Sequence, residues 1–148
     1  MVTILSNFLA WTLILYWIHR IVHVVPVLRN IHMDHHLQVT QGNVGWSLNN
    51  FVLFNDTWMS TLDLWITEVA PTLVFCWVFD CWWIAALYYV WAALIQEEIE
   101  HDFEFDVPVL TSGKWHMVHH TYWMQNYSVF IPIWDLVFGT YASPSRKI

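Results

Sequence analysis

Charged side chains are scarce in this sequence. Only 11% of its 148 residues are Asp, Glu, Lys or Arg, whereas 57% are hydrophobic and 18% are aromatic. A soluble globular domain is about one quarter charged, so this composition argues against one and favours a membrane protein. At this length we expect a single domain over residues 1–148.

Basic residues and cysteines are rarer still. The five basic residues form no patch, and with twelve acidic residues they give a formal charge of −7, so we expect no nucleic acid partner. The two cysteines, Cys76 and Cys81, lie inside apolar sequence. They are too few for a disulfide framework, and we interpret them as small apolar packing residues.

Histidine, in contrast, is abundant and grouped. Residues 32–36 and 116–120 both have the pattern H-x-x-H-H. Residues at i, i+3 and i+4 share a helix face, so we expect each stretch to point three imidazoles at one spot. An i, i+4 pair and a single histidine complete the nine: His19, His23, His32, His35, His36, His101, His116, His119 and His120.

Nine imidazoles exceed the four ligands of one tetrahedral zinc, and they suit two metal ions. Imidazole binds zinc, copper, nickel and iron alike, so the ligand type does not select the metal. Two metals at a membrane surface suggest oxygen activation on an apolar substrate, and iron fits that chemistry because zinc has no redox activity. Zinc can replace iron in purified protein, since it binds such sites more tightly.

The first 18 residues carry no charged side chain. As a helix they would extend about 27 Å, close to the thickness of a bilayer core. No basic region precedes this run and no small-residue cleavage site follows it, so we interpret it as a membrane helix and not as a signal peptide. We expect Pro26 to bend or end the helix, and the polar residues 37–57 to form a loop or interfacial structure.

The apolar stretch from Trp58 to Gln96 fits either one long helix over Thr72–Gln96 or a hairpin that turns near Asp80. If the histidine groups before and after it serve one centre, the chain between them must cross the membrane an even number of times. We therefore predict a hairpin with arms of roughly Leu62–Phe79 and Cys81–Glu98. Both arms are short for a full span, so a re-entrant hairpin in one leaflet is the alternative.

The basic residues predict the orientation. All of them fall on the histidine side of this arrangement: Arg20, Arg29, Lys114, Arg146 and Lys147. The positive-inside rule then places the histidines in the cytosol.

A carboxylate is expected to join the single histidine. Glu97 and Glu98 lie at i−4 and i−3 to His101 and can share its helix face, whereas Glu100 should point elsewhere. We favour Glu97, which repeats the spacing of the i, i+4 histidine pair, as a metal ligand or as a partner of a ligand imidazole. The alternative is that both glutamates mark where the second arm meets water.

The order of these motifs resembles the fatty acid hydroxylase and sterol desaturase family. The matching parts are His19-Arg20-x-x-His23, the two H-x-x-H-H stretches on either side of a hairpin and a single histidine, Asn126-Tyr127, and the segment WDLVFGTY at 134–141. The resemblance implies an all-α integral membrane protein, here with about three membrane helices, and a cytosol-facing di-iron site. It also implies hydroxylation or desaturation of a sterol, fatty acyl or sphingoid lipid with O2 as co-substrate.

The resemblance further implies an external electron donor, such as a cytochrome b5 or a ferredoxin and reductase. The membrane would be the endoplasmic reticulum in a eukaryote or the inner membrane in a bacterium. Two departures are the single helix before the first motif and the acidic neighbours of His101. The compact size also resembles bacterial carotenoid hydroxylases, which makes a related enzyme of that kind one alternative.

A membrane protein that binds metal without turnover is an alternative of a different class. A metal carrier would place its ligands along a path inside the bilayer. Here the histidines cluster after helix ends, and all three multi-histidine motifs are complete. The sequence therefore favours the lipid oxygenase.

Overall fold

The computed structural model describes residues 2–55, 57–102, 104–105, 107 and 109–143, and within these all regular secondary structure is helical. This agrees with the all-α expectation. In chain order the elements are α1 (Val2–Val22), α2 (Pro26–Thr40), η1 (Leu48–Val52), α3 (Trp58–Leu64), η2 (Trp65–Val69), α4 (Ala70–Phe79), α5 (Trp82–Leu94), η3 (Gln96–Glu100), α6 (Lys114–Tyr122) and α7 (Ile133–Phe138).

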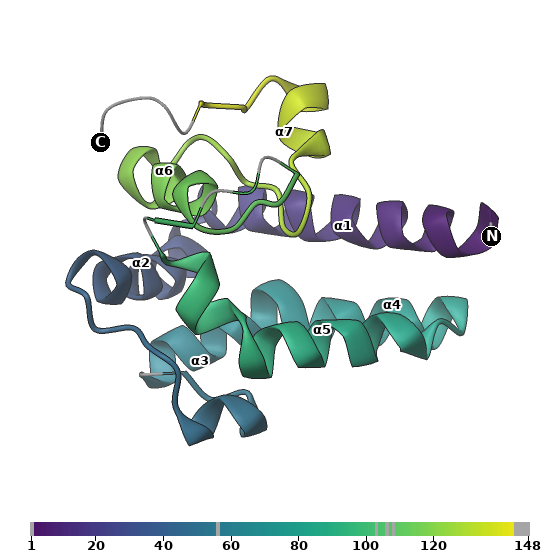
Figure 1. Cartoon of the computed structure of the whole chain (residues 1–148), viewed down its shortest axis with the longest axis horizontal. Helices are drawn as coiled ribbons and strands as arrows, with labels where there is room; N and C mark the ends of the chain where they lie inside the picture. The colour runs from purple at the N-terminus through teal and green to yellow at the C-terminus, as the bar shows by residue number, and fades with distance from the viewer. Residues whose placement is uncertain (1, 56, 103, 106, 108, 144–148) are drawn as a thin grey trace.

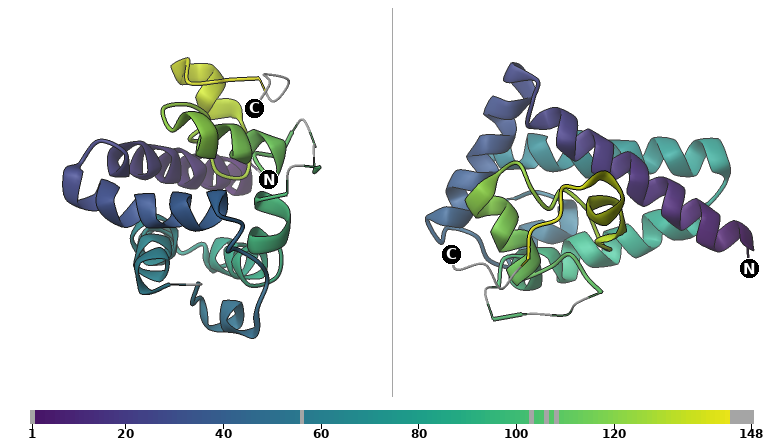
Figure 2. Two further views of the ribbon diagram at one scale, coloured as in Figure 1. Left: turned by 90° about the vertical axis from the view of Figure 1, so that its left-hand side faces the viewer. Right: turned by 90° about the horizontal axis from the view of Figure 1, so that it is seen from above.

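The long helices lie alongside one another. Figure 1 shows α1 next to a hairpin made by α4 and α5, with the N-terminus and the turn of the hairpin at the same end. The helices α2 and α6 lie at the opposite end, and the views in Figure 2 agree. All the histidine-bearing segments therefore gather at one end of the helix bundle.

Pro26 separates the first two helices, as expected. The first helix ends at Val22, and Pro26 begins the next one. Proline suits a first helical position because its missing N–H would have no partner there. Helix α1 continues past the expected 18 residues, so His19 lies within it. Helix α2 likewise runs to Thr40, so the polar segment expected from residue 37 as a loop is helical in its first turn.

The hairpin prediction is confirmed, and the single long helix is excluded. Asp80 adopts a left-handed conformation (φ 48°) that ends α4, and α5 starts at Trp82. The first arm begins at Trp58, earlier than predicted, because the Thr57 side chain caps it by accepting a hydrogen bond from the Ser60 amide.

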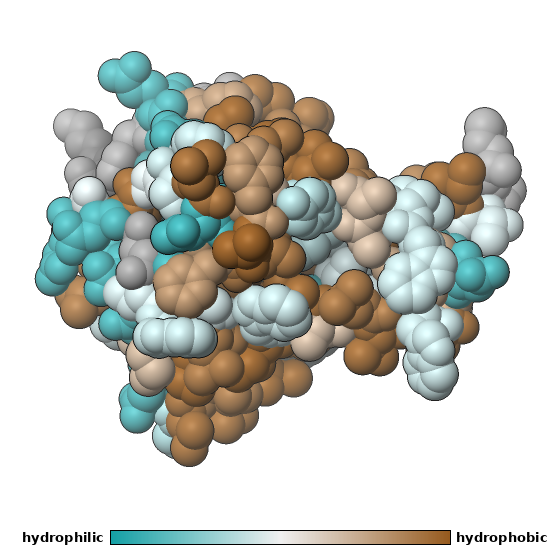
Figure 3. Space-filling view, turned by 90° about the horizontal axis from the view of Figure 1, so that it is seen from below, coloured by the Kyte–Doolittle hydropathy of each residue, from teal (hydrophilic) through white to brown (hydrophobic). Residues whose placement is uncertain are grey.

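Two stretches are long and apolar enough to cross a membrane: Thr3–Val22 and Trp58–Phe79. Helix α5 is apolar but has only 13 residues, which corresponds to about 20 Å. Apart from Asp80 at the turn, large apolar side chains face outward on the hairpin, as Trp77 (76% exposed) illustrates. Figure 3 shows hydrophobic side chains over much of one face, with hydrophilic ones mainly toward the histidine end.

The core lies between α1 and the hairpin. Trp11 is fully buried, and its indole N–H donates to the Thr72 hydroxyl at 2.9 Å, which ties α1 to α4. Cys76 and Cys81 are buried free thiols, as the sequence predicted. Other buried members of this core are Leu15, Leu64, Val69, Phe75, Ile84 and Tyr88.

The apolar run of α7 packs against the first helix. The ring of Phe138 stacks on Tyr16, with centroids 5.2 Å apart, and the Trp134 indole N–H donates to the Thr12 hydroxyl at 3.0 Å. Because Tyr16 and Thr12 precede His19 on α1, α7 braces the helix that carries the first histidine.

Candidate metal centre

Four segments bring the nine histidines together. His19 lies in α1 and His23 directly after it, residues 32–36 lie in α2, His101 follows η3, and residues 116–120 lie in α6. These segments meet at the end of the molecule opposite the hairpin turn (Figure 1). The structure thus places all the predicted histidines in one region.

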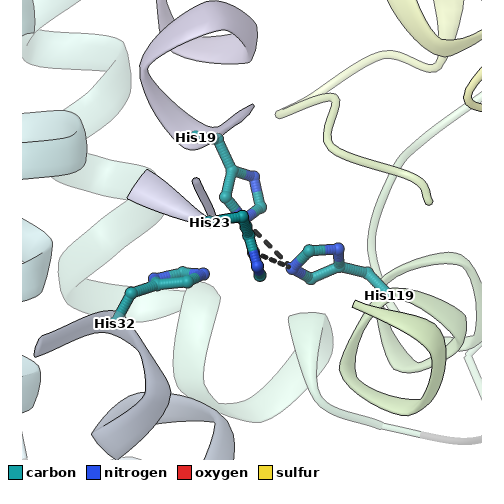
Figure 4. Close-up of side chains that lie close together, drawn as sticks. All are labelled: His19, His23, His32 and His119. Atoms are coloured by element: carbon teal, nitrogen blue, oxygen red, sulfur yellow. Dashed lines mark hydrogen bonds between the residues drawn. The ribbon is translucent and has the colours of Figure 1, made fainter. Parts of the chain in front are cut away.

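Within this region eight histidines form two groups, in each of which one ligand atom per residue lies within 4.8 Å of the others. We call them cluster 1 (His19, His23, His32 and His119) and cluster 2 (His35, His101, His116 and His120). Figure 4 shows the imidazoles of cluster 1 converging from three segments of the chain.

The two H-x-x-H-H stretches are divided between the clusters, which corrects the expectation that each points at one spot. His32 belongs to cluster 1 and His35 to cluster 2, whereas His116 belongs to cluster 2 and His119 to cluster 1. The reason is angular: with 3.6 residues per turn, positions i+3 and i+4 lie on opposite sides of position i, about 100° apart. One H-x-x-H-H stretch can therefore face two clusters.

His36 lies between the clusters. Its Nε2 is 3.1 Å from Nε2 of His32 in cluster 1, and its ring centroid is 4.2 Å from that of His120 in cluster 2. Its Nδ1 is buried without a hydrogen-bond partner. The ninth histidine is thus close enough to contribute to either group.

Three members of cluster 1 are held through their Nδ1 atoms. The Nδ1–H of His19 donates to the Tyr127 carbonyl at 2.9 Å, and that of His119 donates to the Gln125 carbonyl at 2.7 Å. The Nδ1 of His32 is 2.9 Å from a carboxylate oxygen of Asp63. A carbonyl or carboxylate can only accept, so each contact places the ring proton on Nδ1 and leaves the Nε2 lone pair facing the cluster.

These lone pairs face one another. Nε2 of His119 lies 3.0 Å from Nε2 of His19 and 3.1 Å from that of His23. Because Nε2 of His19 and of His119 are both acceptors in these tautomers, no hydrogen bond can join them while the rings are neutral. A cation between them satisfies both, so the donor set of cluster 1 fits a metal ion.

Residues 125–128 supply two of the acceptors for these protons, and Asp135 helps to hold this segment in place. The Asp135 carboxylate accepts hydrogen bonds from the amides of Tyr127 (2.8 Å) and Ser128 (2.9 Å), and from the Thr140 hydroxyl (2.7 Å). The Asn126 amide group donates to the carbonyls of Trp115 and Ala142. These bonds hold residues 125–128 in place, so the carbonyls of this segment can anchor two imidazoles of cluster 1.

Cluster 2 has a different environment. Nε2 of His116 and Nε2 of His120 are 2.8 Å apart, and Nδ1 of His116 is 3.7 Å from the Glu100 carboxylate. Nδ1 of His101 is 3.9 Å from Glu97. Both ring nitrogens of His101 and Nδ1 of His120 are buried without hydrogen-bond partners; a bound cation would satisfy one ring nitrogen of His101.

The surroundings keep the imidazoles neutral. Burial, and then the neighbouring His19 and His32, lower the pKa of His23 to about 2, and burial lowers the pKa of His35 to about 4. Burial likewise lowers the pKa of His36, His101, His116, His119 and His120 well below the usual value. Neutral imidazole is the form that binds metals.

The acidic segment beside His101 is only partly as predicted. Glu97 is buried and faces His101, whereas Glu98 is exposed and accepts a hydrogen bond from the Trp46 amide. Glu100 was expected to point elsewhere, but it is buried and faces His116. The reason is that residues 96–100 form a π-helical turn, in which side chains follow a wider spacing than in an α-helix.

Sequence reasoning missed Asp63 and the anchoring role of Asp135. Asp63 lies inside the apolar stretch from Trp58 to Gln96, and its sequence context assigned it no role. A carboxylate inside a membrane arm is costly unless it has a partner, and that cost is the signal that could have indicated its contact with His32. The carbonyl acceptors of residues 125 and 127 leave no such signal, because every residue has a carbonyl.

The family model for "Fatty acid hydroxylase" matches residues 4–140. The chain belongs to the fatty acid hydroxylase family. Both H-x-x-H-H stretches and the segment WDLVFGTY except Tyr141 fall within the match, so the family resemblance inferred from them is confirmed. No solved structure matches the chain.

Curated relatives of this family member act on sterols, according to their names. The chain is 29% identical to Delta(7)-sterol 5(6)-desaturase erg3B and 28% identical to methylsterol monooxygenase erg25A, both of Aspergillus fumigatus. It is 25% identical to lathosterol oxidase of Mus musculus. These alignments cover 95%, 89% and 98% of this chain but 40%, 44% and 46% of the relatives. The chain therefore spans less than half the length of the curated relatives it matches.

Proposed function

We propose that this protein is a membrane-bound, two-iron oxygenase that hydroxylates or desaturates a lipid. The observation that carries the proposal is the pair of four-histidine clusters, in which ring nitrogens face one another at 2.8–3.1 Å. Neutral nitrogen atoms tolerate such approaches when a cation lies among them. The names of the relatives support a sterol as the substrate class, with fatty acyl and sphingoid lipids as further candidates.

Each cluster would hold one ion. His19, His23, His32 and His119 would bind the first, and His35, His101, His116 and His120 the second. His36 would serve whichever ion it is nearer to, and Glu97 would join the second ion directly or through His101. Iron in these sites supplies the capacity to activate O2 for attack on an unactivated C–H bond.

The chain's own residues would fix this chemistry in place. The carbonyls of Gln125 and Tyr127 and the carboxylate of Asp63 hold the Nδ1 protons of three ligands, so the imidazoles cannot rotate away. The imidazoles of cluster 1 are at most 8% exposed, which restricts the access of bulk water. Hydroxylation of one C–H bond consumes O2, two electrons and two protons and yields one water, and a separate cytochrome or ferredoxin system would supply the electrons.

The membrane arrangement is part of the proposal. We infer that α1 and both arms of the hairpin enter the bilayer, with the histidine end in the cytosol. The position of the N-terminus and the hairpin turn at the same end supports this (Figure 1). Arg20, Arg29 and Lys114 lie in the histidine-bearing helices, as the positive-inside rule requires; Arg146 and Lys147 lie outside the described residues. The membrane would be the endoplasmic reticulum or a bacterial inner membrane.

The decisive experiment combines metal analysis with turnover. Purified protein should contain two ions per chain, as zinc or iron, by elemental analysis. After loading with ferrous iron, it should consume oxygen with a chemical reductant and a membrane lipid extract. Two bound ions without oxygen consumption would instead support a metal-binding protein without turnover. Lipid analysis of cells that express wild-type protein or His119→Ala would then identify the substrate.

A further inference from the structure

The two π-helical turns of the described residues lie opposite each other. Turn η2 (Trp65–Val69) interrupts the first arm of the hairpin, and turn η3 (Gln96–Glu100) follows the second arm. The Gln96 side-chain amide on η3 is 3.4 and 3.5 Å from the two carboxylate oxygens of Glu68 on η2. Such turns are rare and occur frequently at functional sites.

A small cavity lies between these turns and the clusters. It has a volume of about 30 Å³, and Glu68, Gln96 and Glu100 line it together with His32 and His116. A space of this size and polarity can hold a water molecule. The widened turn η3 thus directs Glu100 toward the metal centre and away from solvent.

The first histidine of each H-x-x-H-H stretch faces a buried carboxylate through its Nδ1. In cluster 1, His32 lies 2.9 Å from Asp63, which comes from the first arm of the hairpin. In cluster 2, His116 lies 3.7 Å from Glu100, which comes from the end of the second arm. Glu100 is 4% exposed, and its Oε2 is buried without a hydrogen-bond partner. The two arms therefore place one carboxylate behind each cluster.

From this correspondence we propose that Glu100 is the positioning residue of cluster 2: across 3.7 Å its carboxylate orients the Nδ1–H of His116 electrostatically, where Asp63 holds that of His32 by a hydrogen bond of 2.9 Å. The inference rests on the proposed two-metal function. Fixing the proton on Nδ1 leaves Nε2 of His116 facing Nε2 of His120 at 2.8 Å, where a cation between the rings binds both. Carboxylate partners of ligand histidines typically contribute about 10- to 100-fold to metal affinity.

The test measures metal binding and does not depend on turnover. Full-length protein in detergent is stripped of metal and titrated with Co²⁺, with a chelator as competitor, and the absorption spectrum reports the geometry of each site. Glu100→Gln keeps the shape of the side chain and removes its ability to ionise. We expect this variant to bind the ion of cluster 1 with wild-type affinity and the ion of cluster 2 with an affinity lower by about 10- to 100-fold.

Two variants serve as controls. Glu98→Gln, in the same turn but exposed, should leave both affinities unchanged. Asp63→Asn should lower the affinity for the ion of cluster 1, which Glu100→Gln leaves unchanged. The two variants should therefore alter different parts of the Co²⁺ spectrum.

A coupling experiment separates positioning from general support of the fold. If Glu100 acts through His116, then Glu100→Gln should add nothing to the loss caused by His116→Ala, whereas a structural role would make the losses add. Should Glu100→Gln fold poorly, Glu100→Asp applies the same test, because it keeps the charge but shortens the reach to His116. Wild-type affinity for both ions in these Glu100 variants would overturn the inference and leave the two-metal centre standing. A wild-type chain that binds fewer than two ions would contradict the proposed function itself.

Discussion

The two histidine clusters differ in how firmly the fold holds them. Cluster 1 is buried, and three of its imidazoles have hydrogen bonds of 2.7–2.9 Å at Nδ1. In cluster 2, His35 is partly exposed, and the carboxylates beside His116 and His101 lie 3.7 and 3.9 Å from the Nδ1 atoms of these rings, farther than a hydrogen bond. Cluster 1 is thus organised by the protein alone, whereas cluster 2 depends more on its ion to fix the ring orientations.

The origin of the anchors explains this difference. Cluster 1 takes its acceptors from the segment at 125–128, which Asp135 holds through two backbone amides, and from Asp63 inside a helix. Cluster 2 takes its carboxylates from one π-helical turn. A rigid set of ligands loses less conformational entropy when it binds an ion, so we expect cluster 1 to bind the tighter of the two ions.

Loss of a ligand imidazole should have the largest effect on this comparison. His119→Ala removes the imidazole whose Nε2 contacts both His19 and His23, and His35→Ala removes one from cluster 2. We expect each to abolish lipid oxidation and to lower the metal content by one ion. Thr121→Ala, an exposed neighbour in α6, is the control for elemental analysis and turnover. Wild-type turnover in both histidine variants would refute the oxygenase assignment.

Loss of the Asp135 charge should distinguish the clusters next most strongly. Asp135→Asn weakens the acceptor for the amides of Tyr127 and Ser128, and the destabilisation should be about 1–3 kcal/mol, measured by thermal or denaturant unfolding. The displaced Tyr127 carbonyl would release His19, so the affinity for the ion of cluster 1 should fall selectively. Asp102→Asn, at an exposed position, provides the control. An equal loss of affinity for both ions would argue against separate anchoring of the two clusters.

Glu97→Gln should produce a smaller, selective effect on cluster 2. The carboxylate lies 3.9 Å from Nδ1 of His101, farther than a hydrogen bond, so its support is mainly electrostatic. We expect the weaker ion to lose about 10-fold or less in affinity. The comparison is with Glu98→Gln, and identical titrations of the two variants would leave His101 as the sole ligand from this segment.

Acidification should produce the mildest effect and should be clearest in metal-free protein. The pKa of His35 is lowered to about 4 and that of His23 to about 2, so these two groups, like the other histidines whose pKa burial lowers, bind fewer protons in the folded chain than in the unfolded chain below pH 6.5, and together they outnumber Glu100, whose pKa burial raises. Stability should therefore fall as the pH drops from about 6.5 toward 4. A melting temperature lower by several degrees at pH 5 than at pH 7.5 is the expected result, and bound zinc should reduce the difference. A melting temperature that is independent of pH would contradict neutral buried imidazoles.

The sequence predicted those features that depend on local pattern. Pro26 indicated the break between α1 and α2, and the need for an even number of crossings indicated the hairpin at Asp80. The grouping of the histidines could be inferred from their spacing alone. The break at Pro26 and the grouping follow from short-range rules, whereas the hairpin follows from a requirement on the topology of the chain.

Which histidine of each H-x-x-H-H stretch serves which cluster could not be predicted in this way. It depends on how α2 and α6 face each other, which is a property of the packed molecule. The inward position of Glu100 depends on a π-helical turn, and the α-helical spacing that was assumed gave the wrong face. The anchors at the carbonyls of Gln125 and Tyr127 leave no trace in residue type at all.

The division of each H-x-x-H-H stretch between two clusters has a consequence for the distance between the two ions. His116 and His119 are joined by one turn of α6, and each serves a different cluster; His32 and His35 do the same on α2. Hydrogen-bonded helical turns resist stretching, so each helix holds its two ligand histidines at a fixed distance. Two such helices facing each other therefore fix the distance between the two ions. Loops and side chains elsewhere can vary without altering that spacing, whereas inserting one residue between His116 and His119 would rotate one ligand by about 100° and misplace both ions at once.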